Sequence, residues 1–282
     1  MKRTLRVAAM LLGLLAPSAA RSAPAQSTPP VPLAIGETFT LQSAIMGETR
    51  RINVYRAPLW GDSSATPRPV LYMPDGGIAE DFLHVAGLLQ VSVGNGTMRP
   101  VLLVGIENTQ RRRDMTGPTS DPEDRRIAPV VGGSAAFRSF IRTELMPEID
   151  RRYRTTGETA IMGESLAGLF VVETLFLEPE MFETYIAFDP SLWWNHNALG
   201  TAALPKLMSG ARRTKRLALA SSSEPTIARQ AGEMALRLKA GLAGRLECVY
   251  EPMPEETHAT IYHPAALRAL RRLFAPAPDS TR

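Results

Sequence analysis

A serine between two apolar segments is the residue of this sequence best placed to act as a nucleophile. It lies in the segment Gly163-Glu164-Ser165-Leu166-Ala167-Gly168. Residues 159–162 are typical of a short buried strand, and residues 166–177 carry apolar side chains at helical spacing. A serine on a sharp strand-to-helix turn exposes its hydroxyl, and the following amide favours negative charge. The pattern indicates attack by Ser165 on an acyl carbon, with the Leu166 N–H as one oxyanion donor.

A serine hydroxyl needs a base to accept its proton. The sequence contains four histidines, namely His84, His196, His258 and His263. Only the last two follow the final predicted strand, residues 246–250. His263 precedes Pro264 at the predicted start of the final helix, which is typical of a structural role. His258 lies in the loop before that helix, so we expect it to be the base.

The base in turn needs an acidic residue to orient it. Glu224 comes shortly after the predicted strand 216–220 and is the favoured candidate. Asp189 directly follows the predicted strand 185–188 and is the alternative. A serine–histidine dyad without an acid is the third possibility. The second oxyanion donor is expected in the turn after residues 70–73, where Gly76 and Gly77 both allow close backbone approach.

Apolar strands alternate with helical segments along most of the chain. Strands are predicted at residues 38–45, 50–55, 70–73, 101–106, 159–162, 185–188, 216–220 and 246–250. Helices are predicted at residues 80–90, 137–149 (interrupted near Pro147), 166–177, 226–240 and 265–274. The polar segment 111–133 is predicted to be a long loop, and no insertion resembles a large lid. This order predicts one α/β domain with a mostly parallel sheet covered on both faces.

The first 25 residues have the pattern of a secretory signal peptide. Three basic residues precede an apolar segment, residues 7–15, that is too short to span a bilayer. The formal net charge of +4 falls to about zero without Lys2, Arg3, Arg6 and Arg21, the charged residues of this segment. The signal pattern predicts a periplasmic or secreted protein that is not inserted in a membrane after cleavage. The near-zero charge of the remaining chain argues against binding to nucleic acid.

The remaining sequence divides into a short linker, one domain and a tail. Residues 26–34 are rich in Pro, Ser and Thr and are predicted to be a linker, and residues 276–282 a disordered tail. The domain is expected to span residues 35–275. Cys248 is the only cysteine, which excludes an internal disulfide and a cysteine-based metal site. The sequence does not indicate the oligomeric state.

Six separated segments together resemble the putative-esterase family of α/β-hydrolases, which includes esterase D-type enzymes and enterochelin (siderophore trilactone) esterases. They cover nearly the whole mature chain in family order. The segments are residues 69–77 (PVLYMPDGG), 104–114 (VGIENTQRRRD), 144–150 (ELMPEID), 161–168 (IMGESLAG), 190–194 (PSLWW) and 256–260 (ETHAT).

The resemblance implies an α/β-hydrolase fold with Ser165 as nucleophile, His258 as base and Glu224 as acid. It also places the second oxyanion donor at Gly77, and it implies no metal or organic cofactor. Two positions depart from the family pattern, which commonly has His before the serine and two glycines after the leucine. Here Glu164 precedes the serine, and Ala167 replaces the first of those glycines.

Two further groups are candidates for contact with the substrate. Trp193 and Trp194 follow a predicted strand on the side where loops gather around Ser165. Alternatively, one indole belongs to the core and the other to its rim. The arginines at 111–113 suit a carboxylate or catecholate. Arg113, with Asp114, matches the family's loop motif and alternatively buttresses that loop.

These features predict a serine carboxylic-ester hydrolase that acts on small or medium esters through an acyl-enzyme. A siderophore esterase for catecholate trilactones is the narrower alternative. An acyltransferase differs only in excluding water from the second step. A ligand-binding protein on a hydrolase scaffold is the alternative from another class.

Overall fold

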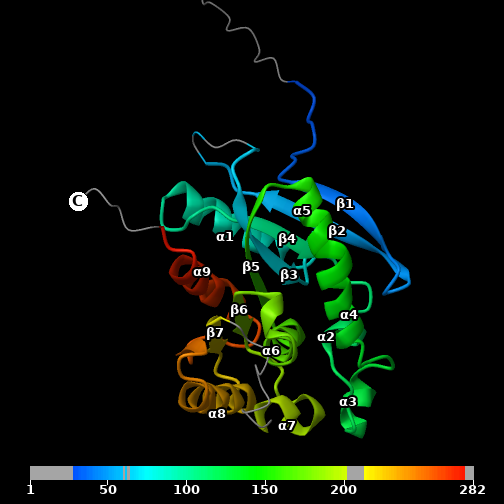
Figure 1. The fold of residues 1–282 in the computed structure, drawn as a ribbon, viewed down its shortest axis with the longest axis vertical. Coiled ribbons are helices and arrows are strands. Elements are labelled where there is room, and N and C mark those ends of the chain that lie inside the picture. The colour runs from blue at the N-terminus through cyan, green and yellow to red at the C-terminus, as the bar shows by residue number, and fades with distance from the viewer. Residues whose placement is uncertain (1–27, 60, 62–63, 202–212, 277–282) are drawn as a thin grey trace, which may run out of the picture. The chain divides into compact units, whose positions relative to one another are not determined.

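The described residues contain one sheet of eight strands, in the order β1-β2-β4-β3-β5-β6-β7-β8 (Figure 1). The strands are β1 Glu37–Ser43, β2 Glu48–Arg56, β3 Arg68–Pro74, β4 Leu102–Ile106, β5 Thr155–Glu164, β6 Thr184–Phe188, β7 Lys215–Ser221 and β8 Leu246–Pro252. β2 pairs antiparallel with β1 and β4, and the strands from β4 to β8 run parallel. The predicted mostly parallel sheet is therefore confirmed.

The computed structural model describes residues 28–59, 61, 64–201 and 213–276. The chain from Ile35 onward is one compact unit, to which all of the elements named here belong. Residues 28–34 contain no helix or strand. The predicted signal peptide, the first two linker residues and the tail after residue 276 lie outside the described residues.

Helices cover both faces of the sheet. They are α1 Phe82–Gly94, α2 Arg111–Met115, α3 Pro122–Ile127, α4 Ser134–Phe140, α5 Met146–Arg152, α6 Leu166–Leu177, α7 Trp194–Thr201, α8 Pro225–Gly241 and α9 Tyr262–Leu273. One core layer packs α4, α5, α6 and α8 against the sheet, and the other packs α1 and α9. No helix within the described ranges is long and apolar enough to cross a membrane.

Two segments differ in detail from the sequence-based expectation. The predicted loop 111–133 contains the short helices α2 and α3. Asp121 caps α3 by accepting the Glu123 N–H at 2.9 Å, and Pro122 supplies the fixed φ of its first turn. The predicted helix 137–149 is α4 and α5 joined by a π-helical turn, Ile141–Leu145, with Pro147 in the first turn of α5.

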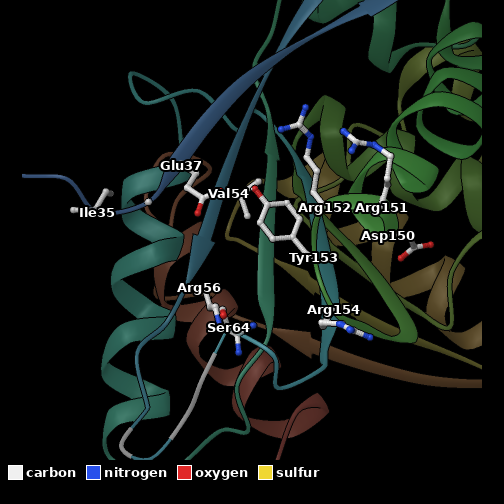
Figure 2. Close-up of a pocket in the computed structure, with 11 residues that line it drawn as sticks. Ile35, Glu37, Val54, Arg56, Ser64, Asp150, Arg151, Arg152, Tyr153 and Arg154 are labelled. Atoms are coloured by element: carbon white, nitrogen blue, oxygen red, sulfur yellow. Dashed lines mark hydrogen bonds between the residues drawn. The ribbon is translucent and has the colours of Figure 1, made fainter.

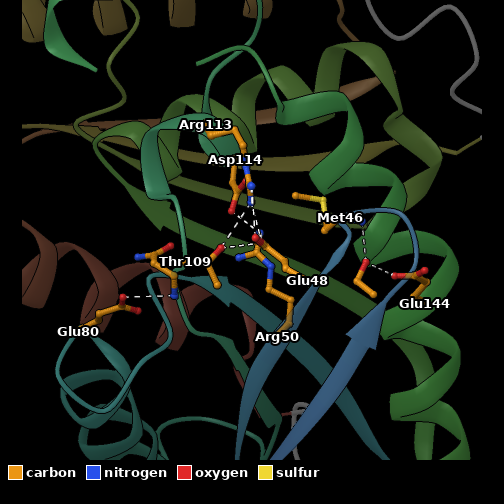
Figure 3. Close-up of polar contacts among 10 residues, drawn as sticks. Met46, Glu48, Arg50, Glu80, Thr109, Arg113, Asp114 and Glu144 are labelled. Carbon is orange, nitrogen blue, oxygen red and sulfur yellow. Dashed lines mark hydrogen bonds and ion pairs between the residues drawn. The ribbon is translucent and has the colours of Figure 1, made fainter. Parts of the chain in front are cut away.

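A buried ion cluster joins the β1–β2 hairpin to the helices beside it (Figure 3). Arg50 of β2 is fully buried and pairs with Asp114 of α2 and with Glu48. Its guanidinium lies over the ring of Phe137 in α4, 5.2 Å from the centroid. Arg113 completes the cluster, with Nη2 2.7 Å from Glu48 and Nε 2.6 Å from Asp114. These charges fix α2 against the sheet.

We expect the substitution Asp114→Asn to lower the free energy of unfolding by about 3 kcal/mol, because it removes the buried one of the two carboxylates that pair with the fully buried Arg50 guanidinium. Urea unfolding followed by circular dichroism measures the change. Glu233→Gln is the control, because its pair with Arg229 is exposed and is worth less than about 1 kcal/mol. Equal effects of the two substitutions would contradict a role of the buried cluster in stability.

Candidate active site

Ser165 lies alone between the end of β5 and the start of α6, in a strained backbone conformation. Its φ is +61°, which is rare for a residue other than glycine. Hydrogen bonds hold the turn on both sides: the Ser165 N–H donates to the Phe188 carbonyl at 3.0 Å, and the Ser165 carbonyl accepts the Ser191 N–H at 3.0 Å. This is the sharp strand-to-helix turn predicted from the sequence.

Small residues make that turn possible. A Cβ atom at Gly163 would lie 2.7 Å from Ala167, and one at Gly168 would lie 3.0 Å from the carbonyl oxygen of Phe188. Ala167 is buried directly against Gly163. The methyl group that departs from the family pattern is therefore accommodated because residue 163 has no side chain.

His258 lies between Ser165 and a buried aspartate. Its Nε2 is 3.1 Å from Ser165 Oγ, and its Nδ1 is 3.0 Å from Asp189 Oδ2. Asp189 directly follows β6, is fully buried and has a φ of +40°. Its second oxygen accepts the Ser222 N–H at 2.5 Å. The three side chains form a continuous chain of contacts of the kind used by serine nucleophiles.

The surroundings of His258 favour its protonated form. The hydrogen bond with Asp189 is the largest cause that raises the pKa of His258, and the charge of Glu164 acts in the same direction. Partial burial opposes both by disfavouring the charged ring. His258 therefore attracts a proton more strongly than an isolated imidazole.

The prediction that Glu224 orients His258 is wrong. Glu224 is the N-cap of α8, where its Oε2 accepts the Ile227 N–H at 2.8 Å. A carboxylate satisfies the unpaired amides at a helix start, and Pro225 at the first helical position marks that start in the sequence. The alternative, Asp189, is the residue that contacts His258.

The loop that carries His258 is tied to the loop that follows β7. The N–H and hydroxyl of Ser223 donate to the Glu256 carbonyl at 2.9 and 2.8 Å. The Thr257 carbonyl accepts the Ile261 N–H at 3.0 Å, which leads into α9. These contacts hold the histidine backbone in place although its imidazole remains partly exposed.

The two glycines after β3 have different roles. The Gly76 N–H donates to the carbonyl of Ile106, the last residue of β4, at 3.0 Å. The Gly77 N–H instead donates to Glu80 Oε2 at 2.6 Å. Leu166, as the first residue of α6, makes no intrahelical hydrogen bond through its N–H. The amides of Leu166 and Gly77 thus differ from that of Gly76 in having no backbone acceptor among the described residues.

Sequence reasoning missed an ion pair at the end of β3. Asp75 directly follows this strand with a φ of +57°. Its carboxylate accepts two hydrogen bonds from Arg111, at 2.6 and 2.9 Å, and one from Asn108 Nδ2 at 2.5 Å. Asp75 and Arg111 both belong to the segments that carry the family resemblance, and this is the feature of the sequence from which the pair could have been predicted.

Glu164 brings a second carboxylate to His258. Its Oε1 lies 3.4 Å from Nε2, the nitrogen that also faces Ser165. Burial is the largest effect and raises the pKa of Glu164 to about 7, while His258 and Arg111 act in the opposite direction. Glu164 therefore changes its charge near neutral pH.

Three side chains of the site that could serve as metal ligands lie close together. Within the described part of the chain, Glu164, Asp189 and His258 are the group whose oxygen and nitrogen atoms lie close enough to hold a metal ion, within 4.8 Å of one another. The Asp189 oxygens already accept hydrogen bonds from His258 and Ser222, and His258 Nε2 faces Ser165. The donor set fits proton transfer to and from Ser165.

Three residues were expected to contact the substrate, and the structure gives two of them, Trp194 and Arg113, other partners. Trp194 is buried, and its indole N–H donates to the Gly117 carbonyl at 2.9 Å, so it packs rather than faces solvent. Arg113 is committed to the ion cluster with Glu48 and Asp114, which fits the alternative that it buttresses its loop. Trp193 is partly buried beside Trp194, and its contact with substrate stays a prediction.

A cavity of about 910 Å³ is lined in part by the residues that directly precede β5 (Figure 2). Tyr153 and Arg154, which line it, precede β5, while Ser165 follows that strand. A strand of ten residues spans about 33 Å. The Tyr153 hydroxyl donates to Glu37 at 2.9 Å across this cavity. The cavity is therefore separate from the serine site.

The chain belongs to the family described as "Putative esterase", whose model matches residues 43–244. Its fold is that of the α/β-hydrolases, as shown by a solved structure of an IroE-like serine hydrolase from Shewanella oneidensis. That structure is 28% identical, with a TM-score of 0.75, and the match covers 85% of this chain and 80% of the other.

Curated relatives match over shorter segments. Ferri-bacillibactin esterase BesA of Bacillus subtilis is 36% identical over 144 residues, which is 45% of this chain and 49% of that protein. Siderophore triacetylfusarinine C esterase of Aspergillus fumigatus is 32% identical over 179 residues, 59% of each chain. The chain thus matches about half of the length of these relatives.

We expect Asp189→Asn to lower the pKa of His258, because the substitution removes the largest interaction that raises it. Titration of the imidazole by NMR measures the change without any substrate. Glu224→Gln is the matched control: it removes a carboxylate of lesser influence on His258 and is expected to cause the smaller shift. A larger shift in the Glu224 variant would contradict the assignment of Asp189.

Proposed function

We propose that this protein is a serine carboxylic-ester hydrolase with Ser165 as nucleophile, His258 as base and Asp189 as the acid that orients the base. The observation that carries the proposal is the chain of contacts from Ser165 Oγ through both nitrogens of His258 to Asp189. Membership of the esterase family and the names of the relatives agree with this reaction class.

In the first step, Ser165 Oγ attacks the ester carbonyl as His258 Nε2 takes its proton. Asp189 stabilises the imidazolium through Nδ1 and keeps the ring in the orientation that serves both steps. The Leu166 N–H at the start of α6 is placed to donate to the developing oxyanion. Gly77 supplies the second donor when Glu80 releases its N–H.

In the second step, the His258 imidazolium gives its proton to the leaving alkoxide, and the acyl group stays on Ser165. His258 then takes a proton from water, whose oxygen attacks the acyl carbon. Collapse of this intermediate releases the acid and returns the proton from His258 to Ser165. The reaction needs no cofactor, and an acyltransferase would differ in using an alcohol in place of water.

The narrower proposal is that the ester belongs to a siderophore. Two curated relatives are named as siderophore esterases, for bacillibactin and triacetylfusarinine C. The match covers about half of each relative, so the support concerns the reaction more than the substrate. The predicted leader in residues 1–25 would place this reaction in the periplasm or outside the cell.

We expect a fluorophosphonate probe to label the purified protein and to leave Ser165→Ala unlabelled. The Ser165 hydroxyl is the group that the probe phosphonylates, and His258 activates it. In-gel fluorescence measures labelling, and circular dichroism shows that the variant is folded. A folded wild type that is not labelled would instead support a ligand-binding protein on a hydrolase scaffold.

We expect hydrolysis of p-nitrophenyl butyrate to fall by about 10³-fold or more in Ser165→Ala and in His258→Ala, since the two residues act as one unit.

The kcat/KM of the wild type should decline as the pH falls through the raised pKa of His258, because the base must be neutral. Parallel assays with a catecholate trilactone test the siderophore proposal, and a failure there with p-nitrophenyl ester activity retained would reject only the narrower substrate.

A further inference from the structure

We propose that Glu164 is a specificity-determining residue whose ionised carboxylate makes the site discriminate against esters that carry a negative charge beside the scissile bond. This inference rests on the ester-hydrolase function proposed above and deepens it. It concerns a residue that departs from the family pattern, in which histidine commonly precedes the serine.

The position of Glu164 gives it direct influence on the reacting atoms. It is the last residue of β5 and the neighbour of Ser165, and its Oε1 lies 3.4 Å from His258 Nε2. That nitrogen must face both Ser165 Oγ and the oxygen of the leaving alcohol during the reaction. The carboxylate is therefore within a few ångströms of the bond that breaks.

The charge of Glu164 is less compensated than that of the acidic groups around it. Its Oε1 is buried and accepts no hydrogen bond within the described residues. Asp75, by contrast, is held by Arg111, and Asp189 by His258 and Ser222. An anionic substrate would meet the field of this buried carboxylate oxygen.

Charged and titratable groups from several elements face Glu164. Arg111 of α2 and His258 of the loop after β8 stabilise its ionised form, whereas Asp75 after β3 and Asp189 after β6 disfavour it. Tyr262 of α9 has a buried hydroxyl whose pKa is raised mainly by burial, with Glu164, Asp75 and Asp81 acting in the same direction. Burial exceeds these effects on Glu164, whose pKa is about 7. The discrimination should therefore increase from pH 6 to pH 8.

The test compares two acetate esters with nearly the same leaving group, 4-acetoxybenzoate (anionic) and methyl 4-acetoxybenzoate (neutral). The measured quantity is the ratio of their kcat/KM values for the wild type and for Glu164→Gln. The difference in intrinsic reactivity between the esters is common to both enzymes, so it cancels in the comparison. Glu233→Gln, which removes the same charge from an exposed face of α8, is the control.

At pH 8 we expect the anionic-to-neutral ratio to be about tenfold higher in Glu164→Gln than in the wild type, from the repulsion of unit charges roughly 7 Å apart, across the benzene ring of the leaving group, at intermediate dielectric. At pH 6 the wild-type ratio should approach that of the variant. Glu233→Gln should retain the wild-type ratio. Glu164→His, which is largely neutral at pH 8, is a second variant and should match Glu164→Gln at that pH.

Three outcomes would overturn the proposal. If Glu164→Gln lowers both rates equally and leaves the ratio unchanged, Glu164 has only a structural role. If the wild-type ratio does not change between pH 6 and pH 8, its carboxylate does not provide the discrimination. If the wild type shows no hydrolysis of the neutral ester above the Ser165→Ala background, the hydrolase function itself is rejected, and this proposal with it.

Discussion

Asp75, Ser165 and Asp189 each directly follow a parallel strand, and each has a positive φ. Their strands, β3, β5 and β6, are neighbours in the sheet, so the three turns meet at one edge. Positive φ costs free energy in residues other than glycine, and such strain persists only where the surroundings compensate for it. The site depends on this constraint, because it places Ser165 and Asp189 where both contact His258, and Asp75 where it binds Arg111.

Hydrogen bonds between loops supply the compensation. The Phe188 carbonyl, at the end of β6, accepts the N–H of Ser165, and the Ala220 carbonyl of β7 accepts the N–H of Asp189. The next loop contributes in the same way, since the Ser222 N–H binds the Asp189 carboxylate. The turns at Ser165 and Asp189 are thus each held by the next strand of the sheet, and Ser165, Asp189 and the loop that carries His258 form one connected unit.

The sequence predicts the order of elements well because most strands are short apolar segments bounded by turn residues. It also identifies Ser165 and His258 as candidates, because a strand-to-helix turn and a histidine in the loop before the last helix can both be recognised from the local sequence alone. It does not separate Glu224 from Asp189, because both follow parallel strands. The difference lies in helix capping at Pro225 and in burial, and burial is a property of the folded chain.

The roles of Arg113 and Trp194 depend on contacts that are distant in sequence. Arg113 binds Glu48 in the β1–β2 hairpin, and the Trp194 indole binds the Gly117 carbonyl. A run of arginines in a loop and a pair of tryptophans after a strand have the same local pattern whether they bind substrate or pack. Their partners lie 65 and 77 positions away, respectively, which no local pattern indicates.

The unequal lengths of the connections around the site bear on how the family can diversify. At Asp75, Ser165 and Asp189 no residue separates the end of the strand from the side chain of interest. One insertion at any of these turns would therefore rotate or displace that side chain. The segment 107–133 between β4 and α4 is longer. Its helix α2 is attached through Arg111 and the Arg50 cluster, and α3 is attached through Asp124, whose carboxylate accepts the Asn195 N–H at 2.8 Å. Length variation that leaves the contacts among Ser165, His258 and Asp189 undisturbed is therefore most readily accepted in the connections between α2, α3 and α4.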